Sequence, residues 1–343
     1  MSLVVFTSQR FADHLTPVGH PERVERAETM YRVVSEWRTR GGDVREPRPA
    51  TIEELGRVHD RDYIALIREL AGRAVALDPD TFTSPLSYEV ACLAAGAACE
   101  AVDHVLDAGP GARACAVVRP PGHHAERGTA MGFCLFNNVA IAAAHARARG
   151  LSRVAIVDYD VHHGNGTQWT FYGDPAVLFI SSHQYPYYPG TGAAGDIGAG
   201  DGRGFTVNLP LEVGATDADY DLVYERVALP ILQQFAPDLI LISAGFDAHV
   251  RDPLAGMRLT TRQFGRLTAL LAGAADRVCG GRVVAVTEGG YDLEALGDSL
   301  GIALRVLGGD ASAGEVAAPD GPRPRGEACL EAVLREIGPF WQL

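Results

Sequence analysis

Short apolar segments alternate with longer mixed segments along the whole chain, and this alternation constrains the fold more than any other feature of the sequence. Several of the short segments are almost entirely apolar, which is typical of parallel strands covered on both faces. The segments between them have the length of helices. The rhythm predicts an α/β fold, with an open, mostly parallel sheet and helices on both faces. The predicted strands are Leu3–Phe6, Ala114–Val118, Val154–Val157, Val177–Ser181, Phe205–Leu209, Leu239–Ser243 and Val283–Thr287. The predicted helices include Tyr88–Ala108, Asn138–Arg149, Tyr220–Phe235 and Thr261–Val278.

Polar residues of unusual type follow the carboxyl ends of several predicted strands. In open parallel sheets, ligands bind at the edge where these strand ends meet. We therefore expect the side chains to gather at one edge of the sheet and to form a site. They are His123 and His124 after the second strand, Asp158 to His163 after the third, His183 after the fourth, Asp247 after the sixth and Glu288 to Tyr291 after the seventh.

The segment DYDVHHGNG at 158–166 indicates a metal site. It places carboxylates and imidazoles just beyond an apolar strand, where burying them without a partner would be unfavourable. Carboxylate oxygens and imidazole nitrogens are ordinary zinc ligands. Asp160 and His162 alternate to the same side, and Asp247, which is otherwise a candidate helix cap, completes a triad at the same edge. Three protein ligands leave positions open for water and substrate, as in catalytic sites. An exposed polar loop is the alternative, which the apolar strand before it disfavours.

Two further motifs predict catalytic groups beside this metal. His123 and His124 follow a stiff Pro-Pro-Gly turn, and histidine titrates near neutral pH, so the pair is suited to moving protons to and from a bound water. A surface metal site or a chance pair is the alternative. The glycines before Tyr291 allow a sharp turn, which would carry its hydroxyl over the site to stabilise an oxyanion. A loop packed by an aromatic ring is the plainer interpretation of that motif.

Composition excludes several classes of protein. The formal net charge of −13 argues against a nucleic-acid binder, which needs a basic surface. No apolar run reaches the roughly 18 residues that span a membrane, so no membrane partner is expected. The first residues lack a signal-peptide pattern, and the six cysteines form no C-x-x-C pair, so we expect reduced thiols and a cytoplasmic location. All 30 basic residues are arginine, which excludes regulation by acetylation of its own lysine side chains.

The chain is expected to form a single domain over residues 1–343, because large α/β folds often exceed 250 residues. The Gly- and Tyr-rich stretch 185–204 is predicted to be a long loop; a phosphate-binding role is disfavoured because no helix follows it. The segment at about 308–326 has the composition of a linker. After it, Leu330, Val333, Leu334 and Ile337 recur at helical spacing, which predicts a C-terminal helix docked on the body.

Taken together, these motifs resemble the histone deacetylase and acetylpolyamine amidohydrolase family, in its class II-like branch. The matching stretches cover nearly the whole chain in the family's order. They are HPERVER at 20–26, RPPGHHA at 119–125, GFCLFNN at 132–138, DYDVHHGNG at 158–166, YPGTG at 188–192, SAGFDAH at 243–249 and EGGY at 288–291. The resemblance implies the arginase-deacetylase fold, with a parallel sheet of about eight strands. It also implies a zinc-dependent hydrolase that removes an acetyl or similar acyl group from lysine or another amine.

The resemblance also assigns roles to individual residues. Asp160, His162 and Asp247 match the metal ligands, with zinc expected and ferrous iron as the alternative. His124 matches the general base and acid, and His123 its electrostatic neighbour. The remaining matches are Asp158 and Asn165 as the partners of His123 and His124, Tyr291 as the oxyanion-stabilising tyrosine, Phe133, Tyr188 and Gly132 at the acyl-lysine tunnel, Leu254 at the gatekeeper position, Arg26 at an inner channel, and Asp158, Ser181 and Ser182 at a candidate potassium site.

Three alternative functions agree less well with the sequence. An acetylpolyamine deacetylase is disfavoured because Leu254 stands where the polyamine-selective branch has Glu, and because the tandem histidines come early in the chain. A non-catalytic metal-binding scaffold is disfavoured because no catalytic position is lost. A two-metal ureohydrolase is disfavoured because Gly164 and His249 stand where it needs further carboxylates. The expected partner is therefore an acylated lysine peptide or a small acylated amine; the sequence predicts no oligomeric state.

Overall fold

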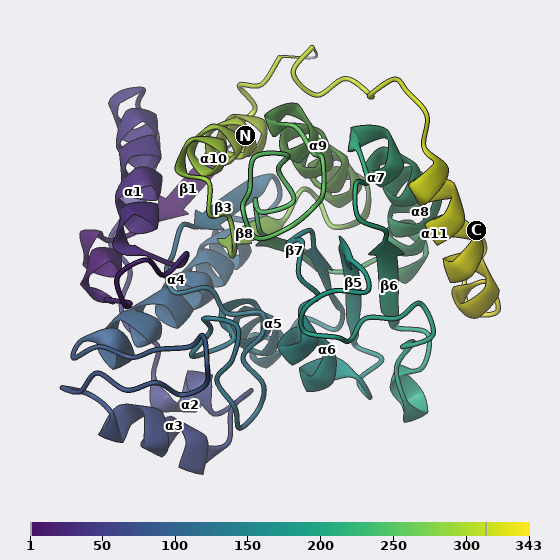
Figure 1. Cartoon of the computed structure of the whole chain (residues 1–343). Coiled ribbons are helices and arrows are strands. Elements are labelled where there is room, and N and C mark those ends of the chain that lie inside the picture. Colours follow the sequence, from purple (N-terminus) through teal and green to yellow (C-terminus); the bar gives the residue numbers. More distant parts are fainter. Residues whose placement is uncertain (1, 313) are drawn as a thin grey trace.

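The structure, a computed structural model, describes residues 2–312 and 314–343. Eight strands form one open sheet in the order β2-β1-β3-β8-β7-β4-β5-β6, and every pairing in the sheet is parallel (Figure 1). The predicted architecture is confirmed. The strands are β1 Ser2–Phe6, β2 Asp43–Arg45, β3 Ala112–Ala116, β4 Val154–Asp158, β5 Val177–Gln184, β6 Thr206–Leu211, β7 Leu239–Ala244 and β8 Val283–Thr287.

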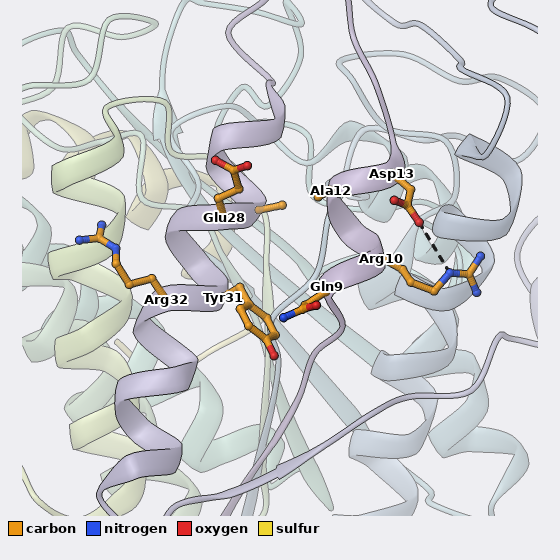
Figure 2. A pocket seen from close by; sticks show the side chains of 8 residues that line it. Gln9, Arg10, Ala12, Asp13, Glu28, Tyr31 and Arg32 are labelled. Carbon is orange, nitrogen blue, oxygen red and sulfur yellow. Dashed lines mark ion pairs between the residues drawn. The ribbon is translucent and has the colours of Figure 1, made fainter.

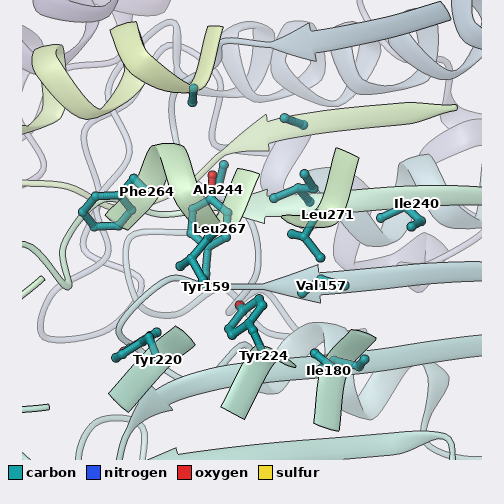
Figure 3. Packing of buried hydrophobic residues seen from close by; sticks show 14 of the residues in the cluster. Val157, Tyr159, Ile180, Tyr220, Tyr224, Ile240, Ala244, Phe264, Leu267 and Leu271 are labelled. Atoms are coloured by element: carbon teal, nitrogen blue, oxygen red, sulfur yellow. The ribbon is translucent and has the colours of Figure 1, made fainter. Parts of the chain in front are cut away.

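Alternate residues of the central strands enter two separate cores. In β4, Val154 and Ile156 join one hydrophobic cluster, while Ala155 and Val157 join the other. Since side chains of a strand point alternately to the two faces, each face of the sheet is buried under helices. Figure 3 shows one face, where Val157 packs with Tyr224 and the residues around them. This double burial explains why central strands such as β4 and β7 are almost entirely apolar.

The helices divide between the two faces (Figure 1). One face is covered by residues of α1, α7 to α11 and the turn between α7 and α8; the other is covered mainly by α3, α4 and α5. None of the helices in the described part of the chain combines the length and apolar character that crossing a bilayer requires. The helices are α1 Val24–Thr39, α2 Ile52–Leu55, α3 Arg61–Glu69, α4 Ser87–Ala108, α5 Asn138–Ala148, α6 Asn165–Phe171, α7 Asp217–Val223, α8 Leu229–Phe235, α9 Thr261–Val278, α10 Leu293–Gly308 and α11 Pro324–Ile337. Short 3-10 turns cover Gln9–Asp13 (η1) and Gly200–Gly202 (η2), and a π turn (η3) covers Tyr224–Ala228.

Several boundaries differ from the sequence prediction. Strand β2 was not predicted, because it is three residues long and polar. Strand β5 continues to Gln184, so His183 lies inside a strand and not beyond its end. The helix predicted over 220–235 begins at Asp217 and contains the π turn, which directly precedes α8. Pro230, at the start of α8, has no backbone N–H to donate, and π turns often occur where the regular ladder is disturbed.

The C-terminal segment returns to the body after α10. Helix α11 lies against α7 and the edge strand β6, and Val333 and Ile337 are fully buried there. Leu330 packs against the same core from a partly buried position. Between α10 and α11, the described part of the segment 309–323 has no helix or strand; Ala313 lies outside the described residues. Helix α11 thus begins near the end of the segment at about 308–326 that has the composition of a linker.

Candidate active site

Three buried side chains meet beyond the neighbouring strands β4 and β7, which pair Asp158 with Ser243. Asp160 and His162 follow β4, and Asp247 follows β7. The imidazole Nδ1 of His162 lies 3.2 Å from Oδ1 of Asp160 and 3.1 Å from Oδ2 of Asp247. Each of the three offers one ligand atom within 4.8 Å of the others. The predicted triad is therefore brought together by adjacency in the sheet.

The surroundings of this triad suit a divalent cation. The backbone N–H groups of Gly289 and Val161 each donate 2.8 Å hydrogen bonds, to Asp160 and Asp247 respectively, which fix the carboxylates. Burial, together with the charge of Asp160, raises the pKa of Asp247 to about 7. Two carboxylates forced together out of water favour a positive partner. The donor set of two carboxylates and one imidazole is one that zinc accepts.

Two glycines make room for the triad. A Cβ on Gly245 would lie 2.1 Å from Oδ2 of Asp160, and a Cβ on Gly289 would lie 2.2 Å from Oδ2 of Asp247. Any larger residue at either position would displace a carboxylate. At Gly245 and Gly289 the backbone therefore lies directly against the carboxylates of the candidate metal ligands.

The tandem histidines lie side by side with opposite electrostatics. Their ring centroids are 4.0 Å apart. Burial alone would lower the pKa of His123, but Asp160 and Asp158 raise it to about 10, and Nδ1 of His123 is 2.9 Å from Oδ2 of Asp158. Burial and the neighbouring charge of His123 lower the pKa of His124 well below 6.5. His124 is thus a neutral imidazole beside a cationic one, and Nδ1 of His124 lies 2.8 Å from Oδ1 of Asn165.

Glu288 holds the tandem histidines in place. Its Oε2 accepts hydrogen bonds from the backbone N–H groups of Gly122 (2.6 Å) and His123 (3.1 Å), and its Oε1 accepts one from the hydroxyl of Ser243 (2.9 Å). Burial raises the pKa of Glu288 to about 7. The sequence marked this residue only as the start of the Glu-Gly-Gly-Tyr turn, and its place directly after an apolar strand was the one available signal.

A narrow pocket of about 160 Å³ leads to the triad. Phe133 and Tyr188 both line it, and the ring of Phe133 meets that of Tyr291 edge-on, with 5.7 Å between ring centroids. Gly132 and Phe133 both have left-handed backbone conformations (φ 56° and 69°). A Cβ on Gly132 would lie 2.4 Å from the ring of His124, so only glycine lets this wall approach the histidine. His124, His162 and Leu254 also line the pocket.

Two residues of the pocket were not predicted. Tyr187 stacks on His162 with 5.8 Å between ring centroids, and its hydroxyl donates to the carbonyl of Leu254 at 2.7 Å. Asp80 contributes a carboxylate to the lining. The tyrosine-rich loop was a signal for Tyr187, whereas Asp80 lies in a segment before α4 that carries no motif and reaches the pocket only through the fold.

Tyr291 is held from two sides. Its backbone N–H donates to Oδ2 of Asp252 at 2.6 Å, and the guanidinium carbon of Arg26 lies 4.8 Å from its ring centroid. Arg26 is fully buried and donates to the carbonyls of Gly290 and Glu288, both at 2.6 Å. Its third contact is Oε1 of Glu22 at 2.8 Å. The residue predicted to line an inner channel thus fixes the loop that carries Tyr291.

The residues of the candidate potassium site also lie together. Asp158 pairs with Ser181 across β4 and β5. The hydroxyl of Ser182 contacts the carbonyl of Asp158 at 3.4 Å and the hydroxyl of Tyr224 at 3.0 Å. The side chain and the carbonyl of Asp158 therefore face different neighbours: His123 and Ser182 respectively.

Other polar groups and cavities lie away from this site. Glu54, Cys99 and His145 are close enough to share a metal, but Arg48 and Arg57 already contact Glu54 and His145, and their positive charges oppose a cation. A groove of about 510 Å³ between η1 and α1 contains none of the predicted site residues (Figure 2). Its lining residues are Gln9, Arg10, Ala12, Asp13, Ala27, Glu28, Tyr31 and Arg32.

Comparison with known proteins shows which family the chain resembles. The histone deacetylase domain model matches residues 20–307. Histone deacetylase 14, chloroplastic, from Arabidopsis thaliana is 43% identical over 275 residues, which are 77% of this chain and 65% of that protein. Polyamine deacetylase HDAC10 from Homo sapiens is 40% identical, with 93% of this chain and 50% of that protein covered. Histone deacetylase-like amidohydrolase from Pseudomonas aeruginosa is 46% identical, with 72% and 66% covered.

The matches thus span two thirds or less of the length of these curated relatives. Among solved structures, the crystal structure of the HDA15 HD domain superimposes with a TM-score of 0.92 at 34% identity, covering 99% of this chain and 97% of that one. The fold is therefore the arginase-deacetylase fold of that domain, as the motifs implied. With the domain match, these likenesses show that the chain belongs to the histone deacetylase family.

Proposed function

We propose that this chain is a zinc-dependent deacylase that hydrolyses the amide of acetyl-lysine or of a similar acylated amine. The observation that carries the proposal is the buried Asp160, His162 and Asp247 group at the base of a narrow aromatic pocket. Beside it stand a neutral imidazole and a tyrosine, as hydrolysis of an amide requires. The names of the relatives, which include both histone and polyamine deacetylases, support the same reaction class.

The side chains have separate tasks in this reaction. When bound at the triad, zinc supplies a Lewis acid that polarises the carbonyl and acidifies water. Neutral His124 takes a proton from the attacking water through Nε2 and returns one to the departing amine. His123, held cationic by Asp160 and Asp158, stabilises negative charge near the reacting centre. The hydroxyl of Tyr291 donates a hydrogen bond to the carbonyl oxygen as that oxygen becomes an oxyanion.

The pocket favours a slender alkyl chain next to the acyl group. The rings of Phe133 and Tyr188 provide apolar walls for the methylenes of a lysine or of a small amine. Leu254, which also lines the pocket, offers no charge to a second ammonium group. One observation favours the polyamine alternative: Asp80 also lines the pocket, and its carboxylate is a partner for a cationic substrate end.

The test is hydrolysis of a fluorogenic acetyl-lysine amide compared with N-acetylputrescine, each with and without chelator. Chelator-sensitive turnover of the lysine substrate supports the proposal. Preferential turnover of the acetylated polyamine would mean that acetylated polyamines are the substrate class and that Asp80 binds their cationic end. If metal-loaded protein turns over neither substrate, longer acyl groups are tried next, and failure there leaves the metal-binding scaffold as the function.

The metal requires a separate measurement. Protein stripped by chelator is reloaded with Zn²⁺ or, without oxygen, with Fe²⁺, and metal content and turnover are measured together. We expect zinc to restore turnover at one equivalent. We also propose that Asp158, Ser181 and Ser182 bind potassium. Removal of potassium is expected to alter turnover without loss of zinc.

A further inference from the structure

The side-chain amide of Asn165 contacts partners of opposite kind at its two ends. Its oxygen lies 2.8 Å from Nδ1 of His124. Its NH₂ group donates to Oε1 of Glu126 at 2.8 Å and lies 3.3 Å from the sulfur of Met131. Both partners on the NH₂ side are acceptors, so the two ends of the amide are not interchangeable.

This orientation decides which nitrogen of His124 carries the proton. An amide oxygen facing Nδ1 requires an N–H on Nδ1, and in a neutral imidazole Nε2 then has a free lone pair. If the Asn165 amide were flipped, its NH₂ group would face Nδ1 of His124 and favour the tautomer with the proton on Nε2. In that tautomer Nε2 has no free lone pair and cannot accept a proton from water. The turned amide would also set its oxygen against the carboxylate of Glu126, which is repulsive. Glu126 thereby selects between an imidazole that can act as a base and one that cannot.

Glu126 is itself fixed by the backbone around it. Its N–H donates to the carbonyl of Thr129 at 2.9 Å, and its carbonyl accepts from Nδ1 of His59 at 2.9 Å. Nε2 of His59 in turn accepts from the backbone N–H of Asn137, also at 2.9 Å. The side chain of Glu126 is partly buried. The backbone of Glu126 is anchored in this way, and its carboxylate contacts the Asn165 amide from that fixed point.

We propose that Glu126 is a positioning residue that acts through Asn165 to keep the proton of His124 on Nδ1. The inference rests on the proposed function, in which His124 is the base. It adds a residue that touches neither substrate nor metal ligand and that the motifs did not single out. Glu126 is needed because Asn165 is an amide with two different ends. A carboxylate at that position would present an acceptor oxygen in either orientation and would need no such partner.

The first test compares Glu126→Ala, Glu126→Gln and the wild type on the substrate that the enzyme turns over. We expect Glu126→Ala to lower kcat by about tenfold with KM changed less than twofold, because orientation of a general base contributes to the chemical step. Glu126→Gln keeps an acceptor oxygen and should lose only about two- to threefold. Arg127→Gln is the matched control: it removes a charge from the same loop, where the Arg127 side chain pairs with exposed Asp60, and should retain wild-type kcat. Equal kcat for Glu126→Ala and wild type would overturn the inference.

The second test asks whether Glu126→Gln has opposite effects on kcat in two backgrounds. In an Asn165→Asp background, the new carboxylate lies against Glu126, so Glu126→Gln relieves repulsion and should raise kcat several-fold. The same substitution lowers kcat when Asn165 is present. A merely structural role for Glu126 gives the same sign in both backgrounds, and that result would refute the proposal. Melting temperatures of all variants verify that each one is folded.

A spectroscopic test separates this inference from the proposed function. With ¹⁵N-labelled histidine, the His124 signals, assigned by loss in His124→Ala, should show the Nδ1–H tautomer in wild type and a mixture in Glu126→Ala. This holds whether or not any acylated amine is hydrolysed. If turnover fails while the tautomer responds, only the proposed reaction is lost. If the tautomer of Glu126→Ala equals that of wild type, the positioning role is lost even in an active enzyme.

Discussion

Adjacent histidines acquire opposite properties here through burial and the charges around them. Asp160 and Asp158 hold the pKa of His123 above its usual value, whereas burial and the charge of His123 keep the pKa of His124 low, with Asn165 as its hydrogen-bond partner. A carboxylate favours the charged form of an imidazole and an amide does not. The two partners lie seven residues apart: Asp158 is the last residue of β4, and Asn165 is the first residue of α6. One short segment thus supplies the hydrogen-bond partner of each histidine.

The hydroxyl of Tyr291 is predicted to act on the oxyanion alone. Tyr291→Phe removes that one oxygen and leaves the ring between Arg26 and Phe133. Loss of one oxyanion donor lowers kcat by about 10²–10³-fold. We expect that fall with nearly unchanged KM and an unchanged melting temperature. Turnover equal to wild type would remove the role of this tyrosine.

Protonation of His59 is predicted to destabilise the fold in acid. Burial lowers the pKa of His59 from its usual 6.5 to about 4. Because the folded-state pKa is depressed, the unfolded state binds the proton first, and stability falls as the pH drops from about 6.5 towards 4. A shift of this size corresponds to a loss on the order of 3 kcal/mol. Nε2 of His59 already accepts from Asn137, so it has no place for a proton.

The measurement is urea unfolding of wild type and His59→Gln between pH 7.5 and 4. The free energy of unfolding of wild type should decline more steeply with acid than that of the variant. Parallel declines of the two proteins would show that other groups, such as His14 and His183, carry the acid sensitivity, since burial lowers the pKa of each of these to about 4 as well.

At the scale of elements, two loops after adjacent strands bring together Asp160, His162 and Asp247, and a third loop lies against them. The turn after β8 supplies Gly289, whose N–H contacts Asp160, and Glu288, whose carboxylate holds His123. Strand β8 is the neighbour of β7. Parallel pairing therefore converts three segments that are distant in sequence into three consecutive loops at one edge.

Gly289→Ala is predicted to weaken metal binding without removing a ligand. Its Cβ would lie 2.2 Å from Asp247 and 2.6 Å from Asp160, so at least one carboxylate must move. We expect zinc content after dialysis, measured by mass spectrometry, to fall at least tenfold. Gly301→Ala is the control, because in α10 its Cβ would meet nothing nearer than 3.7 Å, and alanine favours a helix. Full zinc content in Gly289→Ala would show that the carboxylates of Asp160 and Asp247 can shift without loss of the metal.

The sequence revealed the elements whose pattern is set by burial. Strands such as β4 and β7, covered on both faces, are apolar throughout and were recognised, as were the motifs that follow them. Strand β2 has one partly buried residue between two exposed ones, so no hydrophobic period marks it. Asp80 and Tyr187 join the pocket only because distant loops meet there, a property of tertiary packing that a local pattern does not contain. The contact between Glu126 and Asn165 was missed for the same reason.

For the whole molecule, metal binding is expected to stabilise the fold. A ligand that binds only the folded state contributes about 4 kcal/mol at a thousand times its Kd, which for a chain of this size raises the melting temperature by roughly 5 °C. Chelation should lower the melting temperature by that amount, and added zinc should restore it. Asp247→Ala is the control and should not respond to either treatment. A melting temperature indifferent to chelator in wild type would contradict a tightly held metal.

The adjacency of β4 and β7 also has a consequence for biosynthesis. His162 and Asp247 are 85 residues apart in the chain, and at ribosomal rates of 5–20 residues per second the second ligand is made roughly 4–17 seconds after the first. Glu288 and Tyr291 come later still. A nascent chain cannot close the metal group until both central strands have left the ribosome and paired. A metal that needs all three ligands can therefore be taken up only late in synthesis or after it, once β7 has paired with β4.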